Sequence, residues 1–149
     1  MVVAALLSSI HVLTLALGLS AIVARGRALA RPLDDAGWKR LLAADNAWGA
    51  AAVLWIVSGL GRVFYGGKSP DFYWRNGLFW LKLTLFGLVF VLETWPMATF
   101  VRARMARRQG LPPPNFPLDL YRGINAIEVT LVVSIVFVAA FMARAAWMF

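Results

Sequence analysis

Four long apolar segments dominate this sequence and limit what it can fold into. They cover residues 2–24, 42–61, 77–101 and 123–147, and a helix needs roughly 20 such residues to cross a bilayer. Apolar residues make up 61% of the 149-residue chain, which is too much apolar surface for a soluble fold of this length to bury. The sequence therefore predicts an all-α integral membrane protein, a single domain over residues 1–149 that forms an antiparallel four-helix bundle.

The first apolar segment is expected to remain in the mature protein as a spanning helix. A secretory signal places basic residues before a short apolar core. Here no basic residue precedes the segment, and Arg25 and Arg27 follow it. This order of charged and apolar residues is that of a helix that stays in the membrane.

Basic residues in the connecting segments predict the orientation of the bundle. The formal net charge is +8, and positive residues are concentrated in the first connection, 25–41, and in the third, 102–122. Such connections stay in the cytoplasm, and the aromatic residues at 72–74 and 79–80 fit an outer membrane interface. We therefore expect a multi-pass protein of the bacterial inner (cytoplasmic) membrane, N-out and C-out. Its basic residues would contact anionic lipid headgroups and the bilayer rather than nucleic acid.

The rarity of soft metal ligands excludes several kinds of site. The chain contains no cysteine and one histidine. Disulfides, iron–sulfur clusters, thiolate zinc sites and cysteine nucleophiles are therefore excluded, as is a metal site built on several histidines of one chain.

His11 is the first candidate for chemistry. It lies inside the first apolar segment, where histidine is rare and usually faces the protein interior. A neutral imidazole ligates haem iron well, so His11 could be an axial ligand. The structural alternative is a histidine that is hydrogen-bonded to a hydroxyl on a neighbouring helix. Haem with two histidine ligands from one chain is excluded, so the second ligand would differ, be absent or come from another protomer.

Lys82 and Glu93 are charged residues inside the third apolar segment. Eleven residues separate them, which puts them on one helix face but about 16 Å apart along the axis. Lys82 could extend its ammonium group to the outer interface, whereas Glu93 needs a partner. Arg25 and Arg102 are the expected partners. Glu93 is then either a proton-relay or substrate-binding carboxylate, or one half of a structural ion pair.

Asp45 and Glu128 lie at the predicted cytoplasmic starts of the second and fourth helices, next to Asn46 and Asn125. Carboxylates in a first turn stabilise the helix dipole, so this role is the default interpretation. The alternative is that Asp45, Asn46 and Glu128 join Glu93 in a buried polar site, because all are expected at a similar depth.

The sequence GRVFYGGK at 61–68 combines basic, aromatic and glycine residues. Its glycine spacing is not that of a phosphate-binding loop. An interfacial anchor is the favoured interpretation, and contact with phosphate or acidic lipid is the alternative.

Short motifs spread over nearly the whole chain resemble one family of bacterial membrane proteins. The motifs are Arg31–Pro32–Leu33, Asp45, GLGRVFYGGK at 59–68, Asp71–Phe72–Tyr73, Asn76, Phe79–Trp80–Leu81–Lys82, Glu93–Thr94–Trp95–Pro96–Met97 and Arg102. Together they resemble the predicted membrane proteins that share domain of unknown function 2214. The resemblance implies a membrane-embedded fold over the full length and no particular activity.

A more distant resemblance is to four-helix membrane proteins of the haem-carrying protoporphyrinogen oxidase type and their copper-resistance relatives. His11 matches an early histidine of the first helix, and Trp80–Leu81–Lys82 matches a Trp/Lys pair that opens a later helix. The histidine of the third helix is absent, and Glu93 and Trp95 occupy that region. The resemblance implies a pocket for haem b, with His11 on the iron, and the missing histidine leaves a porphyrin, a quinone or another ligand as the alternative.

Two classes of function follow. In the first, the protein is a small haem-b or other redox or ligand-binding membrane protein, with His11, Arg62, Trp80 and Lys82 around an outer pocket. In the second, it is a non-catalytic scaffold, an accessory subunit or a small transporter, and it forms a homo-oligomer or part of a membrane complex. The sequence does not decide whether the protein is an enzyme.

Overall fold

The computed structural model describes residues 2–66 and 68–144, and this part of the chain is almost entirely helical. The five helices are α1 (Val2–Leu29), α2 (Asp35–Tyr65), α3 (Pro70–Trp74), α4 (Gly77–Arg108) and α5 (Leu118–Ala143). All except α3 are long and apolar enough to cross a membrane. The described residues form no β-strand. The prediction of a multi-pass, all-α membrane protein is confirmed.

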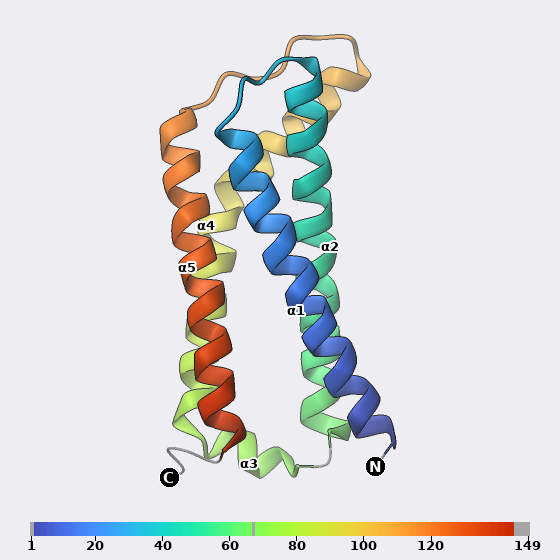
Figure 1. Cartoon of the computed structure of the whole chain (residues 1–149), viewed down its shortest axis with the longest axis vertical. Helices are drawn as coiled ribbons and strands as arrows, with labels where there is room; N and C mark the ends of the chain where they lie inside the picture. Colours follow the sequence, from blue (N-terminus) through green and yellow to red (C-terminus); the bar gives the residue numbers. More distant parts are fainter. Residues whose placement is uncertain (1, 67, 145–149) are drawn as a thin grey trace.

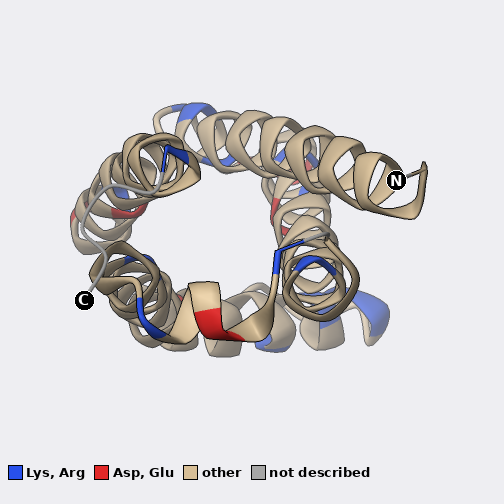
Figure 2. Cartoon of the chain, turned by 90° about the horizontal axis from the view of Figure 1, so that it is seen from below, with Lys and Arg blue, Asp and Glu red and all other residues tan. Residues whose placement is uncertain are grey.

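The four long helices form an antiparallel bundle (Figure 1). Helix α1 packs along α2 and also against α5, and α4 packs along α5. Seen from below, the four helices surround a common axis, and α3 crosses between the α2 and α4 sides (Figure 2). One end of the bundle carries the connections 30–34 and 109–117 and is called the basic end. The start of α1 and the end of α5 lie at the other end, the α3 end.

The helices extend further than their apolar segments. Helix α2 begins at Asp35 rather than at residue 42, because Asp34 caps it by accepting a hydrogen bond of 2.6 Å from the backbone N–H of Gly37. Helix α4 continues through Pro96 to Arg108, and α5 begins at Leu118. The predicted end of the fourth segment, residues 145–147, lies outside the described residues. The short helix α3 was not predicted.

Three apolar clusters follow one another along the bundle. The cluster at the basic end is built on Leu41 and the aromatic residues Trp38, Phe100 and Tyr121. The middle cluster joins Ile22 of α1, Trp48 of α2 and Val132 of α5. The cluster at the α3 end contains Val63, Tyr73, Phe79 and Met142. Charged side chains lie beside these clusters at two levels of the bundle, one around Arg25 and one around Lys82.

Small residues bring α1 and α2 close together. An added methyl group on Gly18 would lie 3.3 Å from the Trp48 ring, and one on Gly59 would lie 3.3 Å from Cε1 of His11. Close approach through small residues is typical of helix packing in membranes. It fixes the positions of His11 and Trp48, which belong to the two polar sites described next.

Candidate functional site

Arg25 is the centre of a buried ionic cluster in the half of the bundle near the basic end. Its side chain is 1% exposed. Nη1 donates to Asp45 Oδ1 over 3.1 Å and to both Glu93 oxygens over 2.8 and 2.9 Å, and Nη2 donates to Glu128. Nε donates to Asn125 Oδ1 over 2.9 Å. One guanidinium group thus connects α1 with α2, α4 and α5.

A second layer of contacts completes this Arg25 cluster. Trp48 Nε1 donates to Glu93 Oε2 over 3.1 Å, and Arg104 donates to the second oxygen of Asp45. The Asn125 amide also donates to the carbonyl of Ile22 over 3.2 Å. Ionisable groups inside a bilayer are costly unless they pair with one another. Here three carboxylates face two guanidinium groups, and every helix of the bundle contributes.

The Arg25 cluster corrects part of the sequence interpretation. Asp45 and Glu128 were expected as first-turn residues, but α2 and α5 begin at Asp35 and Leu118, about three turns earlier. Both side chains point into the bundle instead and join Glu93, as the alternative interpretation proposed. The partner of Glu93 is Arg25.

Two other residues do not take their expected places. Arg102 is exposed, and Asn46 lies on the exposed side of α2, away from the Arg25 cluster. Asn125 is the amide that contacts Arg25. A proton-relay role for the carboxylates stays a prediction.

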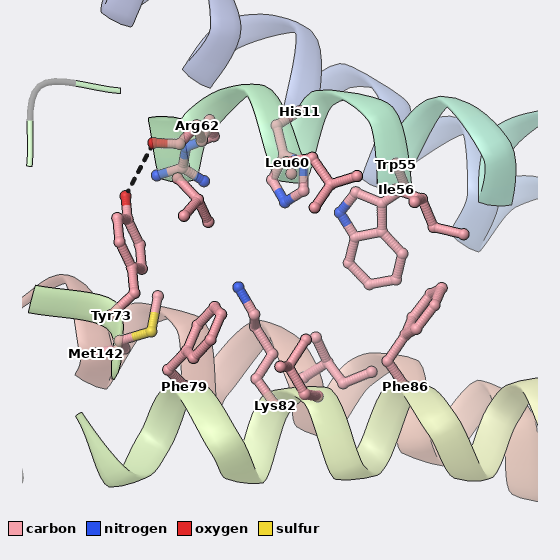
Figure 3. Close-up of a pocket in the computed structure, with 14 residues that line it drawn as sticks. His11, Trp55, Ile56, Leu60, Arg62, Tyr73, Phe79, Lys82, Phe86 and Met142 are labelled. Carbon is pink, nitrogen blue, oxygen red and sulfur yellow. Dashed lines mark hydrogen bonds between the residues drawn. The ribbon is translucent and has the colours of Figure 1, made fainter. Parts of the chain in front are cut away.

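A pocket of about 260 Å³ lies between the helices near the α3 end (Figure 3). Its walls are mostly apolar and come from all five helices, with His11 as the contribution of α1. The apolar wall residues include Trp55, Ile56, Leu60, Val63, Tyr73, Phe79, Leu83, Phe86, Ile135 and Met142. We call this space the α3-end pocket.

The polar side chains of the α3-end pocket are basic groups and hydrogen-bond donors. His11, Arg62 and Lys82 line it, and the Lys82 ammonium group points from α4 across the space toward the α2 side (Figure 3). Nδ1 of His11 lies 2.9 Å from Ser58 Oγ. The buried indole Nε1 of Trp55 has no hydrogen-bond partner among the described residues. No carboxylate of the described chain lines this pocket.

Trp80 differs from the other predicted pocket residues. It does not line the α3-end pocket, and its side chain is about half exposed, with Nε1 donating to the Trp74 carbonyl over 3.1 Å. The helical period explains this, because positions 79, 82, 83 and 86 share a face that position 80 does not share. The residue beside Lys82 in sequence is therefore an outer-surface residue.

Several residues of the two sites were not singled out from the sequence. Arg25 was expected as a partner of Glu93 but not as the centre of a cluster, and Trp48, Arg104 and Trp55 were not considered as site residues. A signal for Arg25 exists, because it continues the helical spacing of the small and apolar residues Gly18, Ala21 and Ile22, all of which are buried. For the tryptophans there is no such signal, since indole rings are common in membrane helices.

Metal binding by a cluster of side chains finds no support in the geometry. No group of three or more histidine, cysteine or carboxylate residues in the described part of the chain could hold a metal ion. A haem group would depend on His11 as the histidine ligand.

Comparison with known proteins places the chain at the level of a family. No curated protein and no solved structure matches it, and the distant resemblance to haem-carrying proteins stays a prediction. A family model described as a predicted membrane protein (DUF2214) matches residues 3–146. The match covers all four spanning helices and both polar sites. The chain therefore belongs to the DUF2214 family of predicted membrane proteins.

Proposed function

We propose that the protein binds a small amphipathic molecule in the α3-end pocket. The observation that carries the proposal is the mismatch of polar groups there: Arg62, Lys82, His11 and the Trp55 indole face an apolar space that contains no carboxylate of the described chain. Cations inside a membrane bundle normally pair with acids. The missing partner would be a carboxylate, phosphate or carbonyl oxygen of a ligand, whose apolar part would contact the aromatic walls.

Haem b is the narrower form of this proposal. Nδ1 of His11 is hydrogen-bonded to the Ser58 hydroxyl, so Nε2 is the nitrogen available to iron. Arg62 and Lys82 would pair with the haem carboxylates, and Phe79 and Phe86 offer faces for the porphyrin ring. When bound, the haem would supply one-electron chemistry, and the protein would set its position and the polarity around it.

An absorption spectrum of the protein purified in mild detergent tests the haem form. A Soret band that shifts on reduction with dithionite and is lost in His11→Ala supports it. Ser58→Ala is the matched control, because it removes the hydroxyl partner and keeps the imidazole. A flat visible spectrum after expression with added haem excludes haem and leaves the broader proposal standing.

Mass spectrometry of small molecules that copurify with the protein tests the broader proposal. Lys82→Met and Arg62→Met are expected to reduce the bound ligand by tenfold or more, because each removes a half-buried charge partner that lines the pocket. Lys68→Met is the control, since Lys68 is an exposed residue of the same end whose ammonium group lies 3.7 Å from the Phe72 ring centre. Equal recovery from all three variants, or no bound molecule in any preparation, contradicts ligand binding and favours a scaffold or accessory subunit.

We further propose that the basic end faces the cytoplasm of a bacterium and the α3-end pocket lies in the outer leaflet. The excess of Lys and Arg at the helix ends that flank the connections 30–34 and 109–117 supports this. Because the chain has no cysteine, single cysteines at exposed positions 31 and 71 can be labelled from one side of intact cells. Labelling of position 31 alone by a membrane-impermeant reagent would reverse the assignment.

A further inference from the structure

A polar depression at the basic end adjoins the Arg25 cluster through Arg104. It lies between the start of α2 and the end of α4 and measures about 370 Å³. Helix α2 contributes Lys39, Leu42, Ala43 and Asn46. Helix α4 contributes Arg104, Arg107 and Arg108. We call it the basic groove.

The spacing of these residues builds the groove from two facing helix surfaces. Positions 39, 42, 43 and 46 follow the three- and four-residue steps of one face of α2, and positions 104, 107 and 108 do so on α4. Because α2 starts where α4 ends, the two faces meet at one end of the bundle (Figure 1). Leu42 and Ala43 give this otherwise polar groove an apolar part.

Positive charge in the groove exceeds the negative charge around it. Asp35 pairs with Lys39 over 2.9 Å and with Arg107 over 2.6 Å, and Asp45 pairs with Arg104. Two carboxylates are thus present for the four cations of the groove, which are Lys39, Arg104, Arg107 and Arg108. One of the two, Asp45, also pairs with Arg25. Nε of Arg104 is buried without a hydrogen-bond partner among the described residues. The groove therefore keeps an excess of positive charge for an anion.

We propose that the basic groove binds a phosphate group, and that its source is the headgroup of an anionic phospholipid. Guanidinium groups match phosphate oxygens in geometry and charge. The groove lies at the ends of two spanning helices. This is the depth at which lipid phosphates are found, and basic pockets between spanning helices bind such headgroups. Leu42 and Ala43 can contact the glycerol and upper acyl chain, which a soluble phosphate lacks.

Binding in the groove would affect the ion pairs inside the bundle. Arg104 donates to one oxygen of Asp45, and the other oxygen of Asp45 accepts from Arg25. A phosphate that contacts Arg104 adds an anion to this chain of charges and holds the ends of α2 and α4 together. Bound anionic lipid should therefore raise the thermal stability of the whole protein.

The test measures lipid binding by native mass spectrometry and the melting temperature in detergent. The lipids are phosphatidylglycerol and, for comparison, zwitterionic phosphatidylcholine. Phosphatidylglycerol is expected to bind more tightly and to raise the melting temperature. Arg107→Gln and Arg108→Gln should each weaken its binding about fivefold, because a basic residue near the headgroup contributes on the order of a fivefold change in affinity.

The control is Arg102→Gln, which removes a charge from an exposed residue of α4 that does not line the groove. Equal weakening by Arg102→Gln would show that the lipid responds to net charge alone, which overturns the site. Equal binding of phosphatidylcholine overturns it as well. If inorganic phosphate or ATP binds in competition with phosphatidylglycerol and raises the melting temperature by itself, the source of the phosphate is a soluble compound and the lipid assignment is wrong.

Discussion

The Arg25 cluster and the α3-end pocket both place charged side chains among membrane helices, but only in the Arg25 cluster do these charges have oppositely charged partners within the chain. Around Arg25, acids and bases from all four long helices face one another, and Trp48 adds a donor to Glu93. In the α3-end pocket, Arg62 and Lys82 face an apolar space, and the Trp55 indole has no partner in the described chain. Charges that have oppositely charged partners within the chain serve the fold, whereas charges without such a partner point to a ligand.

The largest effect is expected where the charges are already paired. Arg25→Met would leave Asp45, Glu93 and Glu128 without their common partner, and removing one member of a buried ionic set costs on the order of 3–5 kcal/mol. We expect strongly reduced stability in denaturation by SDS from mixed micelles. Arg27→Met is the control, because Arg27 is exposed on the same helix. If both variants unfold at the same SDS fraction, the Arg25 cluster does not hold the bundle together.

A pair of identical substitutions compares the two regions more directly. Trp48→Phe removes an indole that donates to Glu93, whereas Trp55→Phe removes one that has no partner in the described chain. Both rings are buried, with 4% and 9% exposed surface, so the loss of packing is similar. We expect Trp48→Phe to cost about 1 kcal/mol more than Trp55→Phe in unfolding free energy, in the range of polar contacts between membrane helices.

The outcome of this pair has a clear meaning in both directions. A larger loss for Trp48→Phe supports the view that the Trp48 indole stabilises the Arg25 cluster, whereas the Trp55 indole has no hydrogen-bond partner among the described residues. If Trp55→Phe is the more damaging variant in ligand-free protein, its indole has an internal role, and the contrast between the regions fails. Ligand recovery then separates the roles further, since only Trp55→Phe is expected to reduce it.

The spanning helices were predictable because hydropathy depends on local composition alone. Their ends were not, because α2 and α5 start in polar turns that an apolar pattern does not include, as the Asp34 cap shows. The error in the helix starts also affected the interpretation of the site. With late helix starts, Asp45 and Glu128 resembled first-turn residues, and their convergence on Arg25 could not be derived.

The α3-end pocket was predictable in part. His11, Arg62 and Lys82 stood out because ionisable residues in or beside an apolar segment are unusual. Trp80 was grouped with Lys82 by sequence proximity, although neighbouring positions on a helix face different directions. The apolar walls depend on which helices surround the space, and this information is in the tertiary arrangement of the bundle rather than in any short segment.

The smallest effect on stability, and the sharpest separation of stability from binding, is expected for Lys82→Met. Methionine keeps the length of the side chain and removes a cation that has no carboxylate partner in the pocket. The gain from removing a poorly solvated charge is opposed by loss of the contact with the Phe79 ring, whose centre lies 5.4 Å from Nζ. Because such a contact contributes about 0.5–1 kcal/mol, the two effects should nearly cancel.

The unfolding free energy of ligand-free Lys82→Met should therefore stay within about 0.5 kcal/mol of the parent value, while the amount of copurified ligand falls. A large loss of stability without ligand would mean that Lys82 is paired inside the protein after all. The α3-end pocket would then be a second site whose charges are paired within the protein, like the Arg25 cluster. Unchanged stability together with lost ligand is the combination that only an external counter-charge explains, because an internal partner would be left unpaired by the same substitution.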